Sequence, residues 1–345
     1  MSRNPATHRM APDDAELRGI LEQAFRGGRK DLLKIDSLSR IPSRYSTSFA
    51  IEEIRVRLAD GRTFELILKD FNRTNMLAEA RRTRPASLFD PVREIAVYRS
   101  VLEAGQFGTA SLIASRADRE SGQFWLVLEK VPGVELFQVG DFGVWQSVAG
   151  YLARLHEKHR PLIHDIKAAV PLLRYDRGFY EKWPRRALSF ASVENESSRN
   201  KLEQISKQYS AVTERLLELP VTLLHGDYNA SNILVSGQEE NVRICPVDWE
   251  LAAMGPGPID LAALVSGQWS EVQREALIAA YIEGRGDKIS NGPETEKLLE
   301  DLKYCQLHLA MQWLGWSENW RPPPEHQQDW LEQAVCLAAE LGLLR

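Results

Sequence analysis

Three polar side chains of this chain, Asp227, Asn232 and Asp248, have types and a spacing that suit metal-dependent chemistry at a hydroxyl group. A carboxylate beside a hydroxyl can orient it and take its proton as the oxygen attacks, which is the role that we predict for Asp227. Asn232 offers a neutral oxygen ligand for a divalent metal ion, and Asp248 offers a charged one. Mg²⁺ prefers such hard oxygen ligands and leaves its other positions to water and phosphates. The three residues therefore indicate phosphoryl transfer from a metal-bound triphosphate to an acceptor hydroxyl.

Two short apolar runs, residues 233–235 and 244–247, are expected to hold two of these side chains in place. Both runs have the length and the branched apolar residues of buried strands. Residues 238–241 supply a turn between them. A hairpin of this kind brings Asn232 and Asp248 together at one end.

Positive charge for the phosphates is expected upstream, because the protein stabilises phosphoryl transfer mainly through electrostatics. Lys69 lies late in an apolar run, residues 63–71, which predicts a strand that would hold the charge rigidly. Glu94 follows on a predicted helix and can pair with Lys69. The alternatives are a solvated strand lysine for Lys69 and a favourable helix-dipole contact for Glu94.

The elements that must position these residues divide into a strand-rich first half and a helical second half. Strands are predicted at residues 47–56, 63–71, 110–115 and 124–130. Alternation puts Phe64, Leu66 and Leu68 on one face of the second of these strands. Other signals in this half are a helix over residues 15–25, a hairpin turn at Asp60-Gly61, and a helix with Asp90 as N-cap and Pro91 at its first position.

Pro132-Gly133 marks the break between the halves. Beyond it, helices are predicted at residues 144–156, 197–217, 270–283, 294–313 and 326–344. The chain has 345 residues and a net charge of −5, which argues against a general nucleic-acid binder. The composition leaves the oligomeric state open.

The three cysteines, Cys245, Cys305 and Cys336, are widely spaced and odd in number, which predicts reduced thiols that pack as small apolar side chains. Neither a signal peptide nor a membrane-spanning run is found in the sequence, so we expect a cytoplasmic protein that does not enter a membrane.

The chain resembles the aminoglycoside phosphotransferase and choline-kinase family, the small-molecule branch of the protein-kinase-like fold. The residues that carry the resemblance are 225–232 (His-Gly-Asp-Tyr-Asn-Ala-Ser-Asn) and 247–250 (Val-Asp-Trp-Glu), supported by 93–98, 151–156 and 259–262. They occur in the family's order, and the order Lys, Glu, His-x-Asp, Asn, Asp also matches the protein-kinase signature. The resemblance extends over residues 47–262.

The resemblance implies an α+β, bilobal protein-kinase-like fold. Residues 1–130 would form an N-terminal nucleotide-binding lobe, an antiparallel sheet with one key helix. Residues 131–134 would be a hinge, and residues 135–345 a larger, mainly helical C-terminal lobe that carries the catalytic and acceptor-binding residues.

The resemblance also assigns roles to individual residues, with ATP and Mg²⁺ as cofactors. It implies Asp227 as catalytic base, Asn232 and Asp248 as metal ligands, and Lys69 as a phosphate clamp paired with Glu94.

The hinge and the loop supports are implied by the resemblance alone. The backbone of residues Glu129 to Val131 would meet the adenine. His225 and Asp260 would support the catalytic loop.

Two departures from the protein-kinase pattern favour the small-molecule branch. The turn that matches the glycine-rich loop contains Ser46, Thr47 and Ser48 and no glycine, so its hydroxyls and amides would have to cover the phosphates. The alternative for these three residues is an ordinary polar turn. Trp249 and Glu250 stand where protein kinases have Phe-Gly, and no activation-loop signature follows.

Two further groups of residues have open interpretations. The arginine-rich stretch 73–84 could close over phosphates, although a solvated surface is the favoured interpretation. Four tryptophans could form an aromatic wall for an acceptor or a cation, although packing is favoured for most of them; they are Trp313, Trp316, Trp320 and Trp330.

The predicted function is therefore ATP-dependent phosphorylation of a hydroxyl on a small molecule such as an antibiotic, an amino alcohol or a sugar. The alternatives are a nucleotide-binding pseudokinase without activity and a protein kinase. An acid-rich segment with tryptophans after Tyr281 is compatible with a cationic acceptor, whereas the basic stretch 174–186 leaves a neutral or anionic one open.

Overall fold

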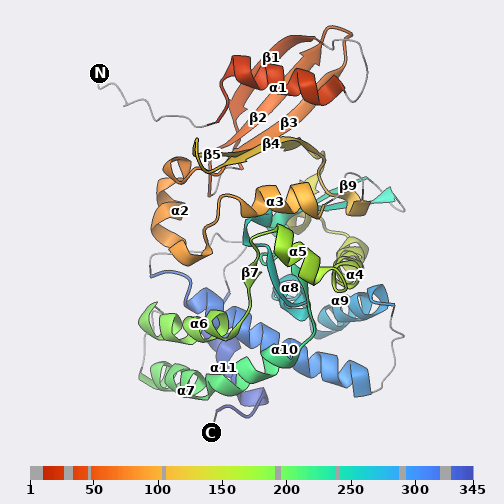
Figure 1. Ribbon diagram of the computed structural model, residues 1–345. Coiled ribbons are helices and arrows are strands. Elements are labelled where there is room, and N and C mark those ends of the chain that lie inside the picture. The colour runs from red at the N-terminus through yellow and green to blue at the C-terminus, as the bar shows by residue number, and fades with distance from the viewer. Residues whose placement is uncertain are drawn as a thin grey trace. The chain divides into compact units, whose positions relative to one another are not determined.

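The computed structural model describes residues 11–26, 34–45, 48–102, 106–190, 196–237, 241–286, 293–318 and 328–344 (Figure 1). The chain divides into two compact units. The first unit comprises Met1–Arg82 and Phe89–Pro132, and the second comprises Thr83–Leu88 and Gly133–Arg345.

The first unit is built on an antiparallel sheet with the strand order β1-β2-β3-β5-β4 among its described residues. Its strands are β1 (Ile35–Pro42), β2 (Ile51–Leu58), β3 (Thr63–Asp70), β4 (Leu112–Asp118) and β5 (Gln123–Glu129). Its helices are α1 (Asp14–Arg26), α2 (Ala78–Thr83), which ends at the first residue of the second unit, and α3 (Arg93–Ser100). The strands that the sequence predicts are thus confirmed, with shifted ends.

Helices cover the two faces of this sheet (Figure 1). Leu17 and Leu21 of α1 are fully buried and pack in one cluster with Leu66 and Leu68 of β3. The burial of each leucine contributes about 1.5–3 kcal/mol. Because side chains alternate along a strand, Lys69 faces the other side, where α3 lies. The predicted apolar face of this strand is confirmed.

Local turn chemistry in the first unit agrees with the sequence at one site and differs at another. Gly61 has a φ of 89° and its amide donates to the carbonyl of Leu58, which confirms the predicted turn. The prediction of Asp90 as N-cap is wrong, since Val92 holds that position in α3. The carboxylate of Asp90 instead accepts a hydrogen bond from the Val92 amide, so it stabilises the turn that leads into the helix.

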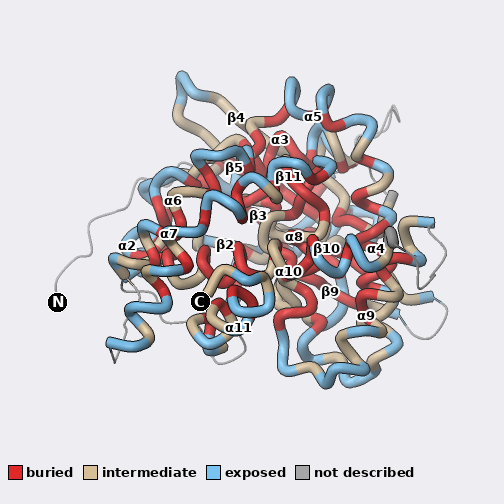
Figure 2. Tube along the Cα trace, turned by 90° about the horizontal axis from the view of Figure 1, so that it is seen from below, coloured by how far each residue is buried: buried red, intermediate tan, exposed pale blue. Residues whose placement is uncertain are grey.

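The second unit is mainly helical, as the sequence predicts. Its helices are α4 (Phe142–His159), α5 (Ile163–Ala169), α6 (Arg177–Phe190), α7 (Glu196–Glu218), α8 (Pro258–Leu264), α9 (Glu271–Gly284), α10 (Pro293–Leu314) and α11 (Trp330–Glu340). Helix α4 packs on α9, and α10 packs on α6, α8 and α11. Figure 2 shows the buried stretches, and α8 is buried at every position from Ile259 to Leu264 except Ala263.

Two small sheets complete the second unit, with the orders β10-β9-β6 and β7-β11-β8 among the described residues. Their strands are β6 (Val134–Glu135), β7 (Leu173–Arg174), β8 (Val221–Leu224), β9 (Ile233–Ser236), β10 (Arg243–Pro246) and β11 (Ala253–Pro256). The antiparallel pairing of β9 with β10 confirms the predicted hairpin.

The tryptophans after Tyr281 pack within the second unit. Trp316 and Trp330 are buried, and the ring of Trp316 stacks on that of Trp183 at 6.0 Å between centroids. These contacts agree with the packing interpretation, whereas Trp320 lies outside the described residues.

All three cysteines carry free thiols, and Cys245 and Cys305 are buried as predicted. Cys336 is exposed on α11, so the prediction that it packs in the interior is wrong. In the part of the chain that the structure describes, none of the helices has the length and apolar character needed to cross a bilayer.

Candidate active site

The loop that follows β8 carries His225, Gly226 and Asp227 in a conformation that only glycine allows at its centre. Gly226 has a φ of 81°, in the left-handed region. A Cβ atom at this position would lie 2.1 Å from the carbonyl oxygen of Leu251. The close approach of the two segments therefore fixes the course of the chain directly before Asp227.

Asp260 holds this loop from the first turn of α8. Its side chain is buried and accepts hydrogen bonds from the amides of His225 (2.7 Å) and Gly226 (3.0 Å). His156 lies on its other side, with Nε2 3.3 Å from Oδ2 of Asp260 and Nδ1 2.9 Å from the hydroxyl of Tyr281. Buried polar groups satisfied in this way fix one conformation, which suits the predicted role of a loop support.

His225 ties the loop to the strand that precedes Asp248. Its Nε2 donates a hydrogen bond to the carbonyl oxygen of Val247 at 2.9 Å. The ring also packs against Trp249, with 4.6 Å between centroids. The roles assigned to His225 and Asp260 stay predictions, and their contacts join the elements that bear the candidate catalytic side chains.

The carboxylate of Asp227 is held by two asparagines. Nδ2 of Asn232 donates to the backbone carbonyl of Asp227 at 2.9 Å and to its Oδ2 at 3.0 Å. Nδ2 of Asn229 donates to Oδ1. Asn229 was not among the predicted site residues, although its place two residues after an aspartate is the spacing of a local side-chain turn.

The hairpin places Asn232 and Asp248 next to one another. Ile233 pairs with Pro246, and the amide of Val247 donates to the carbonyl of Asn232 at 2.9 Å. Because Nδ2 of Asn232 is occupied by Asp227, its Oδ1 is the atom left for a cation. The described residues contain no cluster of three His, Cys, Asp or Glu side chains suited to a metal ion. Two oxygen ligands of this type fit Mg²⁺, which takes its other ligands from phosphates and water.

The electrostatics of the loop disfavour a charged Asp227. The pKa of Asp227 is raised to about 7, mainly because burial disfavours its charged form. The nearby carboxylates of Asp248 and Glu250 raise this pKa further. A hydrogen bond from Asn232 and the charge of Arg84 act in the opposite direction. The three carboxylates therefore interact electrostatically, and the charged form of Asp227 is disfavoured among them.

Arg84 is a nearby positive charge that was not among the predicted site residues. Only 7% of its side chain is exposed, and Nη1 lies 2.5 Å from Oε2 of Glu250. Burial opposes its charged form, but the carboxylates of Glu250 and Asp248 leave its pKa raised. The prediction of a solvated surface for the arginine-rich stretch is therefore wrong for Arg84, whereas Arg82 is exposed as predicted.

Within the first unit, Lys69 and Glu94 form the predicted ion pair. Nζ of Lys69 lies 2.8 Å from Oε1 of Glu94, and their side chains are 10% and 1% exposed. Lys69 is in the middle of the sheet, opposite Ile51 of β2 and Leu126 of β5. The interpretation of Lys69 as a solvated strand lysine is wrong, because burial and the ion pair fix its ammonium group.

The remaining predicted nucleotide contacts are placed only in part. Ser46 and Thr47 lie outside the described residues, and the carbonyl of Ser48 accepts a hydrogen bond from the Leu77 amide at 3.0 Å. Their role in covering phosphates stays a prediction.

The predicted hinge backbone follows β5. The side chain of Glu129 accepts a hydrogen bond from the Ser111 amide at 3.1 Å, and Val131 is buried. The contact of this segment with adenine, and the action of residues 131–134 as a hinge, stay predictions.

The sequence of residues 52–299 matches the model of the phosphotransferase enzyme family. The chain belongs to this family. This membership confirms the resemblance found in the sequence. It also confirms the predicted enzyme class of this phosphotransferase, which is a small-molecule kinase. No curated protein sequence matches the chain.

Solved structures similar to this phosphotransferase have the same fold at low sequence identity. The GDP complex of wild-type aminoglycoside 2'-phosphotransferase-IIIa has a TM-score of 0.55 at 13% identity, over 94% of this chain and 97% of that one. An ethanolamine kinase of Plasmodium vivax has a TM-score of 0.54 at 11% identity, over 98% and 94%. A choline/ethanolamine kinase family protein of Mesorhizobium loti has a TM-score of 0.53 at 17% identity, over 95% and 94%. These likenesses confirm the protein-kinase-like fold.

The Lys69–Glu94 pair of the phosphotransferase gives a first testable prediction. Replacing Lys69 with Met leaves the Glu94 carboxylate buried without its cation, so we expect the free energy of unfolding to fall by about 3 kcal/mol. The double variant Lys69→Met/Glu94→Leu is expected to recover most of this loss. Chemical denaturation measures both effects.

Lys130 is the matched control, because its Nζ also lies close to a carboxylate, 2.6 Å from Oε2 of Glu53, while 33% of its side chain is exposed. Lys130→Met is expected to cost about 0–1 kcal/mol. Equal losses for the two lysines would contradict the importance of burial at Lys69.

Proposed function

We propose that this phosphotransferase transfers the γ-phosphate of ATP to a hydroxyl group of a small molecule, with Mg²⁺ bound by Asn232 and Asp248. The main support is the arrangement around Asp227, whose carboxylate is fixed by hydrogen bonds beside the two candidate metal ligands. An oriented carboxylate next to metal-bound phosphates is what the reaction requires.

The chemistry assigns one step to each group. The acceptor oxygen forms a bond to the γ-phosphorus, its proton passes to Asp227, and the bond from that phosphorus to the β,γ-bridging oxygen breaks to release ADP. Mg²⁺, when bound, neutralises phosphate charge and is held by the oxygens of Asn232 and Asp248. Lys69, with Glu94 fixing its ammonium group, is assigned to the phosphates.

The acceptor is proposed to be a hydroxylated metabolite or antibiotic. The similar structures include kinases of ethanolamine and a phosphotransferase of aminoglycosides, which are small hydroxylated molecules. We also propose that the protein acts in the cytoplasm and does not bind nucleic acid, as its net charge of −5 suggests.

An ATP-consumption screen over hydroxylated metabolites and antibiotics, with Mg²⁺ present, tests the proposal. We expect at least one acceptor to stimulate ATP use, with formation of one phosphorylated product per ADP. Binding of nucleotide without turnover on any acceptor would favour a pseudokinase. Labelling of proteins alone would favour a protein kinase.

A further inference from the structure

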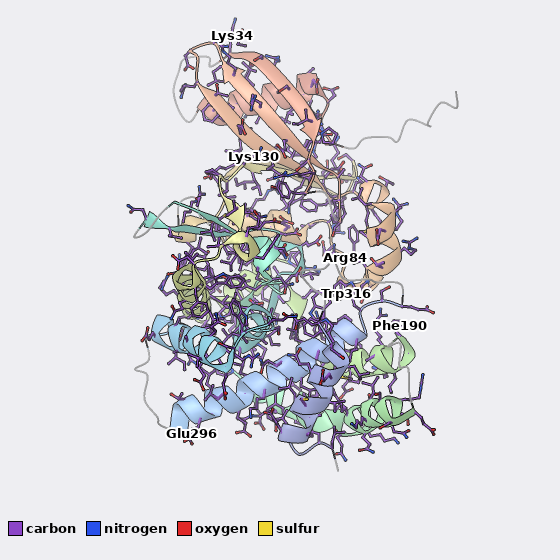
Figure 3. The ribbon with its side chains drawn as sticks, turned by 180° about the vertical axis from the view of Figure 1, so that it is seen from behind. Lys34, Arg84, Lys130, Phe190, Glu296 and Trp316 are labelled. Carbon is purple, nitrogen blue, oxygen red and sulfur yellow. The ribbon has the colours of Figure 1, made fainter. Side chains whose placement is uncertain are left out.

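The segment Thr83–Leu88 folds with the second unit, although the residues on both sides of it belong to the first. Arg84, labelled in Figure 3, lies in this segment. Only 7% of its side chain is exposed. A guanidinium group is costly to bury unless it meets negative charge. Glu250, two residues after Asp248, supplies one such charge through the ion pair with Nη1.

The ion pair with Glu250 does not satisfy the Nε–H group of Arg84. The Nε–H group is buried and has no hydrogen-bond partner among the residues that the structure describes. No hydrogen bond joins it to Asp227, whose two carboxylate oxygens accept from Asn229 and Asn232. A ligand oxygen that binds at the site can satisfy a buried, fixed donor of this kind.

The ligand that fits this donor is an anion close to Asp227. The charges of Asp248 and Asp227 both raise the pKa of Arg84. The guanidinium is therefore close enough to the candidate base and the candidate metal ligand to interact with them electrostatically. During phosphoryl transfer, negative charge spreads over the three equatorial oxygens of the transferred group. Donors that are already in place stabilise such charge strongly where water is excluded.

We propose that Arg84 is a catalytic residue whose Nε–H donates to an equatorial oxygen of the phosphoryl group during transfer, while Glu250 fixes its guanidinium. This inference rests on the proposed function. It makes Glu250 a positioning residue, which acts through Arg84.

The test compares the binding of MgADP alone with the binding of MgADP plus aluminium fluoride, which mimics the phosphoryl group in transfer. The wild-type protein is expected to bind MgADP more tightly when the fluoride is present. In Arg84→Gln we expect the affinity for MgADP alone to stay within about twofold of wild type. The gain in MgADP affinity that aluminium fluoride causes is expected to fall by about 10- to 100-fold. Isothermal titration calorimetry measures both values.

Two further variants separate catalysis from structure. Arg82→Gln removes a charge from an exposed side chain two residues away and is expected to keep the full gain. Arg84→Gln/Glu250→Gln removes both members of the buried pair, so that no carboxylate is left without its cation. If Arg84 contacts the phosphoryl group, the double variant also lacks the gain in MgADP affinity that aluminium fluoride causes in wild type.

Two outcomes overturn the inference, and a third overturns the proposed function beneath it. An unchanged gain in Arg84→Gln means that Arg84 does not contact the transferred group and leaves an anionic acceptor as its partner. A restored gain in the double variant means that Arg84 serves only to neutralise Glu250. If no variant, including wild type, binds MgADP, the proposed function itself fails.

Discussion

Replacing Asp227 with Asn should lower the rate of phosphoryl transfer by about 10²- to 10⁴-fold, the usual contribution of a general base. Asparagine keeps the shape of the side chain and one oxygen, which can accept the hydrogen bond of either Asn229 or Asn232. It cannot take the proton of the acceptor hydroxyl. We therefore expect MgATP to bind as in wild type, and Asp227→Ala to lose turnover as well.

Steady-state kinetics with the acceptor found by the screen, together with nucleotide titration, measures this effect. Asp165→Asn is the control, since Asp165 is exposed on α5 of the same unit and is expected to leave kcat unchanged. Retained turnover in Asp227→Asn or Asp227→Ala would contradict the assignment of the base.

Features of the site that depend on local sequence could be predicted without the structure. The apolar runs around residues 233–235 and 244–247 have the length of strands, and their pairing follows from the short turn between them. This hairpin brings Asn232 and Asp248 together. The alternation along β3 likewise put Lys69 on the face opposite the leucines that pack on α1.

Features that depend on tertiary contacts could not be predicted in this way. Arg84 belongs to an arginine-rich stretch whose composition is that of a solvated surface. Its burial follows from the position of Thr83–Leu88 in the second unit and from its contact with Glu250, 166 positions further along the chain. The start of α3 was misplaced for a different, local reason. The carboxylate of Asp90 accepts a hydrogen bond from the amide of Val92, and a capping pattern in sequence does not distinguish that turn from the helix itself.

Gly226→Ala is expected to abolish phosphoryl transfer and to lower the free energy of unfolding by about 3–5 kcal/mol. The left-handed conformation alone costs a non-glycine residue about 1–2 kcal/mol. In addition, the new Cβ would lie 2.1 Å from the carbonyl oxygen of Leu251, which is backbone and cannot turn away. The loop must therefore move, and it carries Asp227 with it.

Gly61→Ala separates the two causes, because Gly61 has a similar φ of 89° while no atom lies within 4 Å of a Cβ built there. This control is expected to lose only about 1–2 kcal/mol and to keep its activity. Chemical denaturation and the transfer assay measure both variants. If Gly226→Ala lost no more stability than Gly61→Ala and remained active, the approach of Leu251 would not be what fixes the loop. The hydrogen bonds of Asp260 to the amides of residues 225 and 226 would then be sufficient to hold Asp227 in position.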